Sequence, residues 1–259
     1  MGAVQDPADY PDFVARFYDV IYAELRGAAE GEGFFDRILA CQGPVLEIGV
    51  GTGRLFAAAL DSGADIYGID VNATMIEQLQ AKLPAEHRHR MAVQDARALD
   101  LQPRFELVVA PFRVFAHLLA VDDQLAALSS IADHLAPAGR FLFDLFVPNP
   151  ALLASGLDQV QDFDGEYAPG KRLRRVVSMR ADVVDQISHV TMEFIWDEDG
   201  TERRGEWRLP LRLFYRYELE HLVHRSPLEL EAIWGDYAET PLGPESKEMV
   251  VVCRKPGRS

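Results

Sequence analysis

Apolar runs of strand-forming residues alternate with amphipathic helical segments through the first part of the chain. The strand-like runs cover residues 45–48, 66–69, 91–93, 105–110 and 141–147. Helical patterns at residues 55–60, 73–83 and 122–135 lie between most of them. Such alternation is typical of an α/β fold, in which a parallel sheet carries helices on both faces. Ligands of these sheets bind at the carboxyl ends of the strands, so a functional site is expected there.

The pattern changes between residues 158 and 216. Apolar side chains alternate with polar ones over residues 190–196 and again over residues 207–217. The turn-forming segment Asp197–Gly200 separates the two runs, which predicts an antiparallel hairpin. Residues 172–184 are expected to form a third strand. We therefore interpret residues 158–216 as an antiparallel β insert.

The insert holds a large share of the basic residues of an acidic chain. The full sequence has a formal net charge of −15, whereas the insert carries ten Lys or Arg against twelve Asp or Glu. The arginines of the insert either lie on a solvated surface or belong to a lid that offers their positive charges to an anionic group of a ligand. Its wide apolar stripes predict that it covers an acceptor pocket or pairs with a second copy, giving a homodimer. The overall negative field repels phosphate backbones, so no nucleic-acid partner is expected.

No segment of the sequence predicts a membrane partner. No apolar run approaches the ~18 residues that cross a bilayer. The first residues, Met1–Phe13, lack the basic and apolar regions of a signal peptide. Cys41 and Cys253 are expected to be reduced thiols. We therefore expect a cytoplasmic protein.

Three glycines, Gly49, Gly51 and Gly53, follow the first predicted strand at alternate positions. A strand that passes through glycines into a helix brings its backbone close to a ligand. A dinucleotide fingerprint requires its third glycine at residue 54 or 56, where this chain has Arg54 and Phe56. A nicotinamide-dependent reductase is therefore the weaker alternative.

Two carboxylates follow the next two strands. Asp70 ends the second strand and is suited to accept both hydroxyls of a ribose. Asp95 follows the third strand and is suited to accept from the exocyclic amine of adenine. Val71 and Met75 are expected to cover the faces of the base. Together these residues predict a nucleoside cofactor.

These motifs resemble those of class I S-adenosylmethionine-dependent methyltransferases. The resemblance rests on Glu47–Gly53, Asp70, Asp95-Ala96, the strand segments 105–112 and 135–146, and a closing strand pair at 228–234 and 247–253. Within the class, the chain is most similar to small-molecule N- and O-methyltransferases with an antiparallel insert after the fifth strand. The resemblance implies a Rossmann-like seven-stranded sheet, parallel except for a reversed final strand, with helices on both faces.

The resemblance also implies how one methyltransferase domain, residues 1–259, is organised. Residues 1–43 would form an N-terminal helical lid. Residues 44–157 and 217–259 would form the cofactor-binding core, and residues 158–216 the insert.

S-adenosylmethionine is the cofactor that the resemblance implies, with S-adenosylhomocysteine as its product. The glycines would lie against the methionine moiety, Asp70 would bind the ribose, and Asp95 would bind adenine together with the backbone of Ala96. Further implied cofactor contacts are Tyr18, Tyr22, Glu47, Arg54 and Pro111.

Methyl transfer from a sulfonium is an in-line displacement, in which alignment supplies much of the rate. His117 follows the fourth strand and is the expected general base, although a role as a wall residue stays open. Phe112, Arg113, Asp144 and Arg212 are expected to contact the acceptor. Arg113 could instead pair with an acid, and Asp144 could instead cap a loop.

The expected acceptor is a small molecule that is methylated on nitrogen or oxygen. Amino sugars, amino acids, peptides and natural-product intermediates all fit this expectation, and no metal is expected. An alternative from another functional class is a protein that binds the cofactor without catalysis, as a sensor or a partner subunit.

Overall fold

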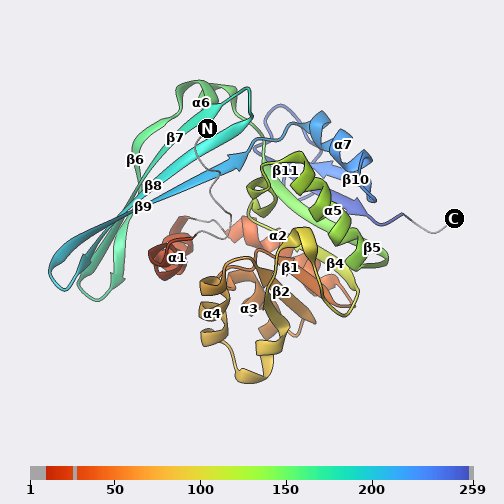
Figure 1. The fold of residues 1–259 in the computed structure, drawn as a ribbon, viewed down its shortest axis with the longest axis horizontal. Coiled ribbons are helices and arrows are strands. Elements are labelled where there is room, and N and C mark those ends of the chain that lie inside the picture. The colour runs from red at the N-terminus through yellow and green to blue at the C-terminus, as the bar shows by residue number, and fades with distance from the viewer. Residues whose placement is uncertain (1–9, 26–27, 257–259) are drawn as a thin grey trace. The chain divides into compact units, whose positions relative to one another are not determined.

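The computed structural model describes residues 10–25 and 28–256. The chain divides into two compact units, drawn in Figure 1. The larger unit holds residues 28–147 and 214–259, and the smaller unit holds residues 1–27 and 148–213. Within the described residues, no helix is long and apolar enough to cross a membrane.

Seven strands form the sheet of the larger unit, in the order β10-β11-β5-β4-β1-β2-β3. Only β11 runs antiparallel to its neighbours, β5 and β10. The predicted sheet, parallel except for its final strand, is therefore confirmed. The strands are β1 (Val45–Ile48), β2 (Ile66–Asp70), β3 (Met91–Val93), β4 (Phe105–Ala110), β5 (Leu135–Phe146), β10 (Glu229–Trp234) and β11 (Glu248–Arg254).

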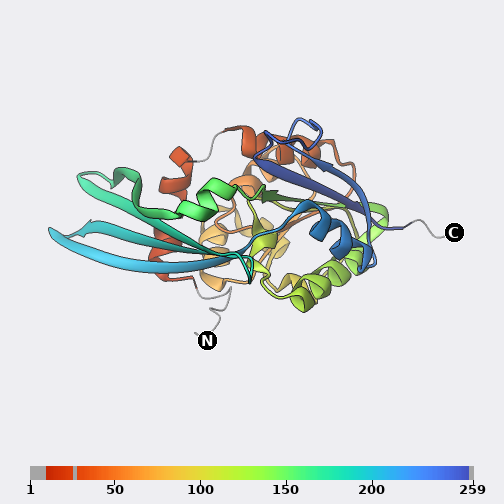
Figure 2. The ribbon, with the colours of Figure 1, turned by 90° about the horizontal axis from the view of Figure 1, so that it is seen from above.

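Helices cover both faces of this sheet. Figure 2 shows α2 on one side of the strands and α5 and α7 on the other. The α-helices of the larger unit are α2 (Ala28–Ala40), α3 (Arg54–Asp61), α4 (Ala73–Lys82), α5 (Val121–His134) and α7 (Arg216–His224). Three short 3₁₀ helices are η1 (Ala85–Arg90), η2 (Ala96–Ala98) and η3 (Val114–His117).

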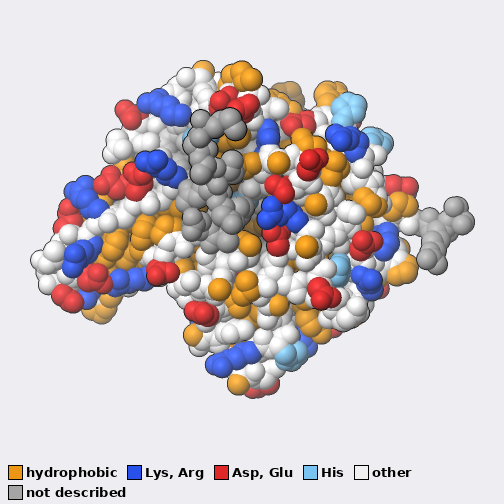
Figure 3. Space-filling model, in the orientation of Figure 1, with side chains coloured by type: hydrophobic (Ala, Val, Ile, Leu, Met, Phe, Trp, Pro, Cys, Tyr) orange, Lys and Arg blue, Asp and Glu red, His pale blue; other side chains and the backbone are white. Residues whose placement is uncertain are grey.

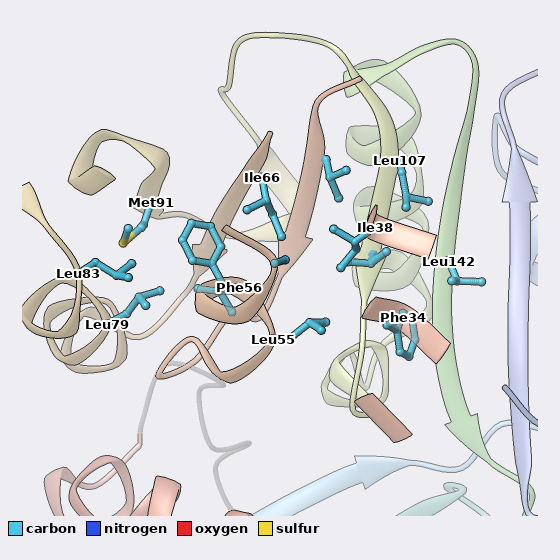
Figure 4. Close-up of a cluster of buried hydrophobic side chains, with 14 of the residues drawn as sticks. Phe34, Ile38, Leu55, Phe56, Ile66, Leu79, Leu83, Met91, Leu107 and Leu142 are labelled. Carbon is cyan, nitrogen blue, oxygen red and sulfur yellow. The ribbon is translucent and has the colours of Figure 1, made fainter. Parts of the chain in front are cut away.

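A hydrophobic cluster fixes three of these helices to the sheet (Figure 4). Phe34 of α2, Phe56 of α3 and Leu79 of α4 are completely buried in it, together with side chains of the strands. Burial of a large apolar side chain stabilises a fold by about 1.5–3 kcal/mol relative to exposure. This packing holds the loops at the carboxyl ends of the strands in place.

Four long antiparallel strands form the sheet of the smaller unit, in the order β6-β7-β8-β9. The predicted hairpin around Asp197–Gly200 is confirmed, because β8 and β9 pair across it. The sequence pattern missed β6 and the short helix α6. The elements are α1 (Asp12–Leu25), α6 (Pro150–Ser155), β6 (Leu157–Ala168), β7 (Lys171–Asp182), β8 (Ile187–Glu198) and β9 (Thr201–Arg212).

Helix α1 covers the apolar face of this four-stranded sheet. The ring of Phe13 lies 5.2 Å from that of Phe194, and the ring of Tyr10 lies 4.6 Å from that of Trp207. A Cβ atom on Gly205 of β9 would lie 2.6 Å from the ring of Phe13, so this glycine makes room for the helix. Helix α1 thus packs on the apolar stripes of the insert, burying Phe194 and Trp207 and leaving Met192, Trp196 and Leu209 partly buried.

One predicted strand boundary was wrong. The alternating pattern that extends to Tyr217 belongs to a strand only as far as Arg212. Tyr215 caps helix α7, whose Glu218 side chain accepts from the Tyr215 backbone N–H. The N-terminal segment 1–43 contains two helices, of which α1 belongs to the smaller unit and α2 to the larger one. Its role as a lid stays a prediction.

Candidate functional site

The loop between β1 and α3 passes through three glycines with left-handed backbones, at φ angles of 69° for Gly49, 55° for Gly51 and 86° for Gly53. A Cβ atom on Gly49 or Gly53 would clash with the side chain of Val114 or of Leu79, respectively. A Cβ atom on Gly51 would meet nothing within 4 Å. The space in front of Gly51 is therefore open, and its backbone can approach a ligand closely.

Asp70 ties this loop to the end of β2. Its Oδ2 accepts from the backbone N–H of Gly51 at 2.9 Å, and its Oδ1 accepts from that of Asn72 at 2.9 Å. Burial raises the pKa of the Asp70 carboxyl, although the amide hydrogen bonds from Asn72, Gly51 and Val71 oppose that shift. Asp70 thus orders the glycine loop, and its binding of a ribose stays a prediction.

Glu47 lies in β1, directly before the loop, and is 1% exposed. Its Oε2 has no hydrogen-bond partner among the described residues. Burial and the charge of Asp70 raise the pKa of Glu47 well above its ordinary value, although Arg54 opposes the shift. A buried acceptor without a donor costs about 1–3 kcal/mol. A ligand with an N–H donor, such as the amine of a methionine moiety, fits this position.

At the end of β3, Asp95 is paired with a neighbouring arginine, and its predicted contact with adenine stays a prediction. Arg97 donates to both oxygens of Asp95, at 2.5–3.0 Å, and to Asp123 at 2.9 Å. Burial acts to raise the pKa of Asp95, but the hydrogen bonds and charge of Arg97 outweigh it and hold that pKa below its ordinary value. Ala96 begins η2 beside it and is half-buried.

The two apolar residues predicted to cover adenine differ in exposure. Val71 is half-buried at the end of β2 and keeps accessible surface. Met75 is only 2% exposed, because its position on α4 faces inward. Almost none of the Met75 side chain reaches the surface, and its predicted packing on a base stays a prediction.

At the end of β4 the chain makes an unusual turn. Phe112 and Arg113 both have left-handed backbones, at φ angles of 63° and 66°. The guanidinium of Arg54 lies over the Phe112 ring, 4.6 Å from its centroid. Pro111, which precedes the turn, is buried. The turn thus places Phe112 beside the first residue of the helix that follows the glycine loop.

Arg113 and Asp144, two predicted acceptor contacts, are buried behind this turn. Arg113 is 6% exposed and Asp144 is fully buried. Arg113 forms an ion pair with Asp144 at 3.4 Å and with Glu248 at 2.5 Å. The second possibility left open by the sequence, a pairing of Arg113 with an acid, is the one the structure contains. Neither side chain presents surface to an acceptor.

His117 ends the 3₁₀ helix η3 and is half-buried. Burial lowers its pKa to about 4. At neutral pH the ring is therefore uncharged, but its affinity for a proton is low. Its assignment as a general base stays a prediction.

Three predicted site residues belong to the smaller unit. Tyr18 and Tyr22 pack against each other on α1, with ring centroids 4.4 Å apart. The hydroxyl of Tyr22 accepts from the buried Arg175 at 3.2 Å. Arg212 ends β9 and donates to the backbone carbonyl of Asp185 at 2.6 Å. These contacts lie within the smaller unit, so the assigned roles of the three residues stay predictions.

Many arginines of the insert pair with acids on the same sheet. Figure 3 shows basic and acidic side chains next to each other over this region. The ion pairs include Arg172–Asp164, Arg174–Glu202, Arg204–Glu193 and Arg208–Glu206. Arg216 pairs with Glu220 on α7, outside the sheet. The pairing favours a solvated surface over a cationic lid for these residues.

The sequence analysis missed Val114, Tyr237 and Glu248. Val114 packs on Gly49, whereas Tyr237 and Glu248 contact Asp144 and Arg113. Val114 could have been found from its place beside the predicted strand end. No local sequence pattern identifies Tyr237 or Glu248, because the residues that they contact lie about a hundred residues away in the chain.

Comparison with known proteins agrees with this arrangement. Residues 45–139, from β1 to the start of β5, match a family model described as a methyltransferase domain. Over 256 residues the chain is 24% identical to the cypemycin N-terminal methyltransferase of a Streptomyces species, covering 97% of this chain and 100% of that protein.

Solved structures of methyltransferases share the complete fold. The CcbJ methyltransferase from Streptomyces caelestis is 25% identical, with a TM-score of 0.74, over 98% of this chain and 100% of that one. An S-adenosylmethionine-dependent methyltransferase from Clostridium acetobutylicum is 15% identical, with a TM-score of 0.75, over 95% of this chain and 98% of that one. Both similarities extend over the antiparallel sheet as well as the larger unit.

Proposed function

We propose that this S-adenosylmethionine-dependent methyltransferase of the small-molecule type transfers the methyl group to an amine nitrogen. The proposed acceptor is an amino sugar, an amino acid or the amino terminus of a peptide. The similar protein from Streptomyces is named an N-terminal methyltransferase, which supports an amine acceptor.

The observation that carries the proposal is the burial of His117 and Asp144, the two predicted site residues that could act as a base. Burial lowers the pKa of His117 to about 4. Asp144 is fully buried and accepts hydrogen bonds from Arg113 and Tyr237. An alcohol needs a base at the reacting oxygen, which is worth ~10²–10⁴-fold in rate. An amine with a pKa near ~10 instead loses its proton to bulk water before it binds.

In this proposal, S-adenosylmethionine supplies an activated methyl group, and the protein aligns the neutral amine with it. Glu47, Asp70 and the open face of Gly51 hold the cofactor. Phe112 and His117 form the wall that orients the acceptor nitrogen. Alignment and exclusion of water then account for most of the rate.

Matched pairs of small molecules test the choice of atom. Each pair consists of an amine and the alcohol of the same skeleton, such as an amino sugar and its hydroxyl counterpart. The protein is incubated with S-adenosylmethionine, and S-adenosylhomocysteine and the methylated acceptor are measured by mass spectrometry. We expect the amines to be methylated and the alcohols to remain unreacted.

The variant His117→Gln gives a second measurement with the accepted amine. The rate should fall by less than ~10-fold, because no proton is transferred to residue 117. The wild-type rate should rise with pH up to the pKa of the amine itself. Methylation of the alcohols in preference to the amines would overturn the proposal.

A further inference from the structure

The turn after β4 holds two consecutive side-chain-bearing residues in a backbone conformation that favours glycine. Phe112 and Arg113 have φ angles of 63° and 66°. Their Cβ atoms make this conformation unfavourable, so it persists only where surrounding contacts hold it. The structure contains such contacts, and all of them lie in the larger unit.

One carboxylate contacts both the main chain and the side chain of Arg113. Asp144 Oδ1 accepts from the Arg113 backbone N–H at 3.1 Å, and Asp144 Oδ2 lies 3.4 Å from Arg113 Nε. Arg113 Nη2 donates to Glu248 Oε1 at 2.5 Å. The guanidinium also lies over Phe146, 4.0 Å from the ring centroid. Arg113 is therefore held at several points at once.

Tyr237, in the loop between β10 and β11, holds the same carboxylate from another direction. Its hydroxyl donates to Asp144 Oδ2 at 2.8 Å. Burial and the charge of Asp144 raise the pKa of Tyr237, so the hydroxyl keeps its proton. The side chain is fixed against α2, where a Cβ atom on Gly33 would lie 2.5 Å from Tyr237 Cβ. The four linked side chains thus connect β5, β11, α2 and the turn.

The residues on either side of Arg113 contact the glycine loop or its helix. A Cβ atom on Gly49 would lie 2.4 Å from Val114 Cγ2, so Val114 packs directly on that glycine. Phe112 lies under the guanidinium of Arg54, the first residue of α3. A shift of the turn would therefore move the surfaces that pack on the cofactor loop.

We infer that Arg113, Asp144, Glu248 and Tyr237 are positioning residues that hold the left-handed turn against the glycine loop. They set the shape of the cofactor site without touching the acceptor. The inference does not depend on which acceptor atom receives the methyl group.

The variants Tyr237→Phe and Glu248→Gln test this role with little change in volume. Amide hydrogen exchange followed by NMR reports on the turn, because the N–H of Arg113 bonds to Asp144 and that of Ala116 bonds to the Arg113 carbonyl. Both amides should exchange up to about tenfold faster in the variants, the effect of one lost hydrogen bond. Calorimetry with S-adenosylhomocysteine should show a several-fold weaker affinity.

The matched control is Glu231→Gln, which removes the charge of an exposed carboxylate paired with Arg140 on the same sheet. This variant should change neither the amide hydrogen exchange of Arg113 and Ala116 nor the affinity for S-adenosylhomocysteine. A merely structural role predicts a lower melting temperature for Tyr237→Phe and Glu248→Gln, with wild-type exchange at Arg113 and Ala116 and wild-type affinity. That result would overturn the inference. Since S-adenosylhomocysteine binding needs no acceptor, failure of the amine proposal would leave this test intact.

Discussion

Alanine substitutions in the glycine loop should separate the cost to the fold from the cost to ligand binding. Gly49 and Gly51 both have positive φ angles. An alanine methyl at Gly49 would lie 2.4 Å from Val114 Cγ2, whereas one at Gly51 would meet nothing within 4 Å. Gly63, between α3 and β2, has a φ of 90° and equally open space. It therefore serves as the matched control for backbone strain.

The magnitudes follow from these geometries. A left-handed backbone costs alanine about 1–2 kcal/mol, so Gly51→Ala and Gly63→Ala should lower the free energy of unfolding by similar amounts. Gly49→Ala adds overpacking against Val114, which costs about 1–3 kcal/mol more. Its total loss should therefore be about 2–5 kcal/mol.

Urea denaturation measures these losses, and calorimetry with S-adenosylhomocysteine measures binding. Gly51→Ala should weaken the affinity at least tenfold, about 1.4 kcal/mol, because its methyl fills the space next to the loop. Gly63→Ala should bind as the wild type does. The reasoning fails if Gly51→Ala keeps full affinity, or if Gly49→Ala is as stable as Gly63→Ala.

Three further predictions concern the rest of the molecule. Asp70→Ala should weaken S-adenosylhomocysteine binding by about 1.5–3 kcal/mol, since the Gly51 amide loses its acceptor; unchanged affinity in calorimetry would refute this. Gly205→Ala should loosen α1, because the added methyl would lie 2.6 Å from the Phe13 ring; limited proteolysis should then cut α1 faster than in the wild type. His117, with its pKa lowered to about 4, takes up a proton more readily when unfolded. Stability should therefore be fully present above pH ~6.5 and fall between ~6.5 and about 4, by at most about 3.4 kcal/mol. Urea titrations at several pH values should show that His117→Gln lacks this part of the pH dependence.

The residue pattern alone determined the alternating core of the larger unit. Strands β1, β3 and β4 begin and end at the predicted residues. The glycine loop and the carboxylate at the end of β2 were also found from the sequence. Apolar strand periodicity and glycine backbones are local properties, so a short window of sequence contains the information.

The tertiary structure decided how the smaller sheet is covered and which of the predicted site residues are buried and paired. Strand β6 escaped detection because several consecutive side chains near its start are exposed, which removes the alternation of a half-buried strand. The cover of the insert came from α1, more than a hundred residues earlier in the chain. No periodicity within the insert identifies the element that buries its apolar face.

The surroundings of Asp144 could likewise not be predicted from the sequence. The sequence shows only that a carboxylate lies near the end of a strand. It does not show whether that carboxylate faces a cleft, where it could contact an acceptor, or a buried cation. Its partners Arg113, Tyr237 and Glu248 are brought to it by the sheet order and by the packing of the β10–β11 loop on α2. Burial and pairing are properties of the assembled fold, because they depend on which distant segments meet around the side chain.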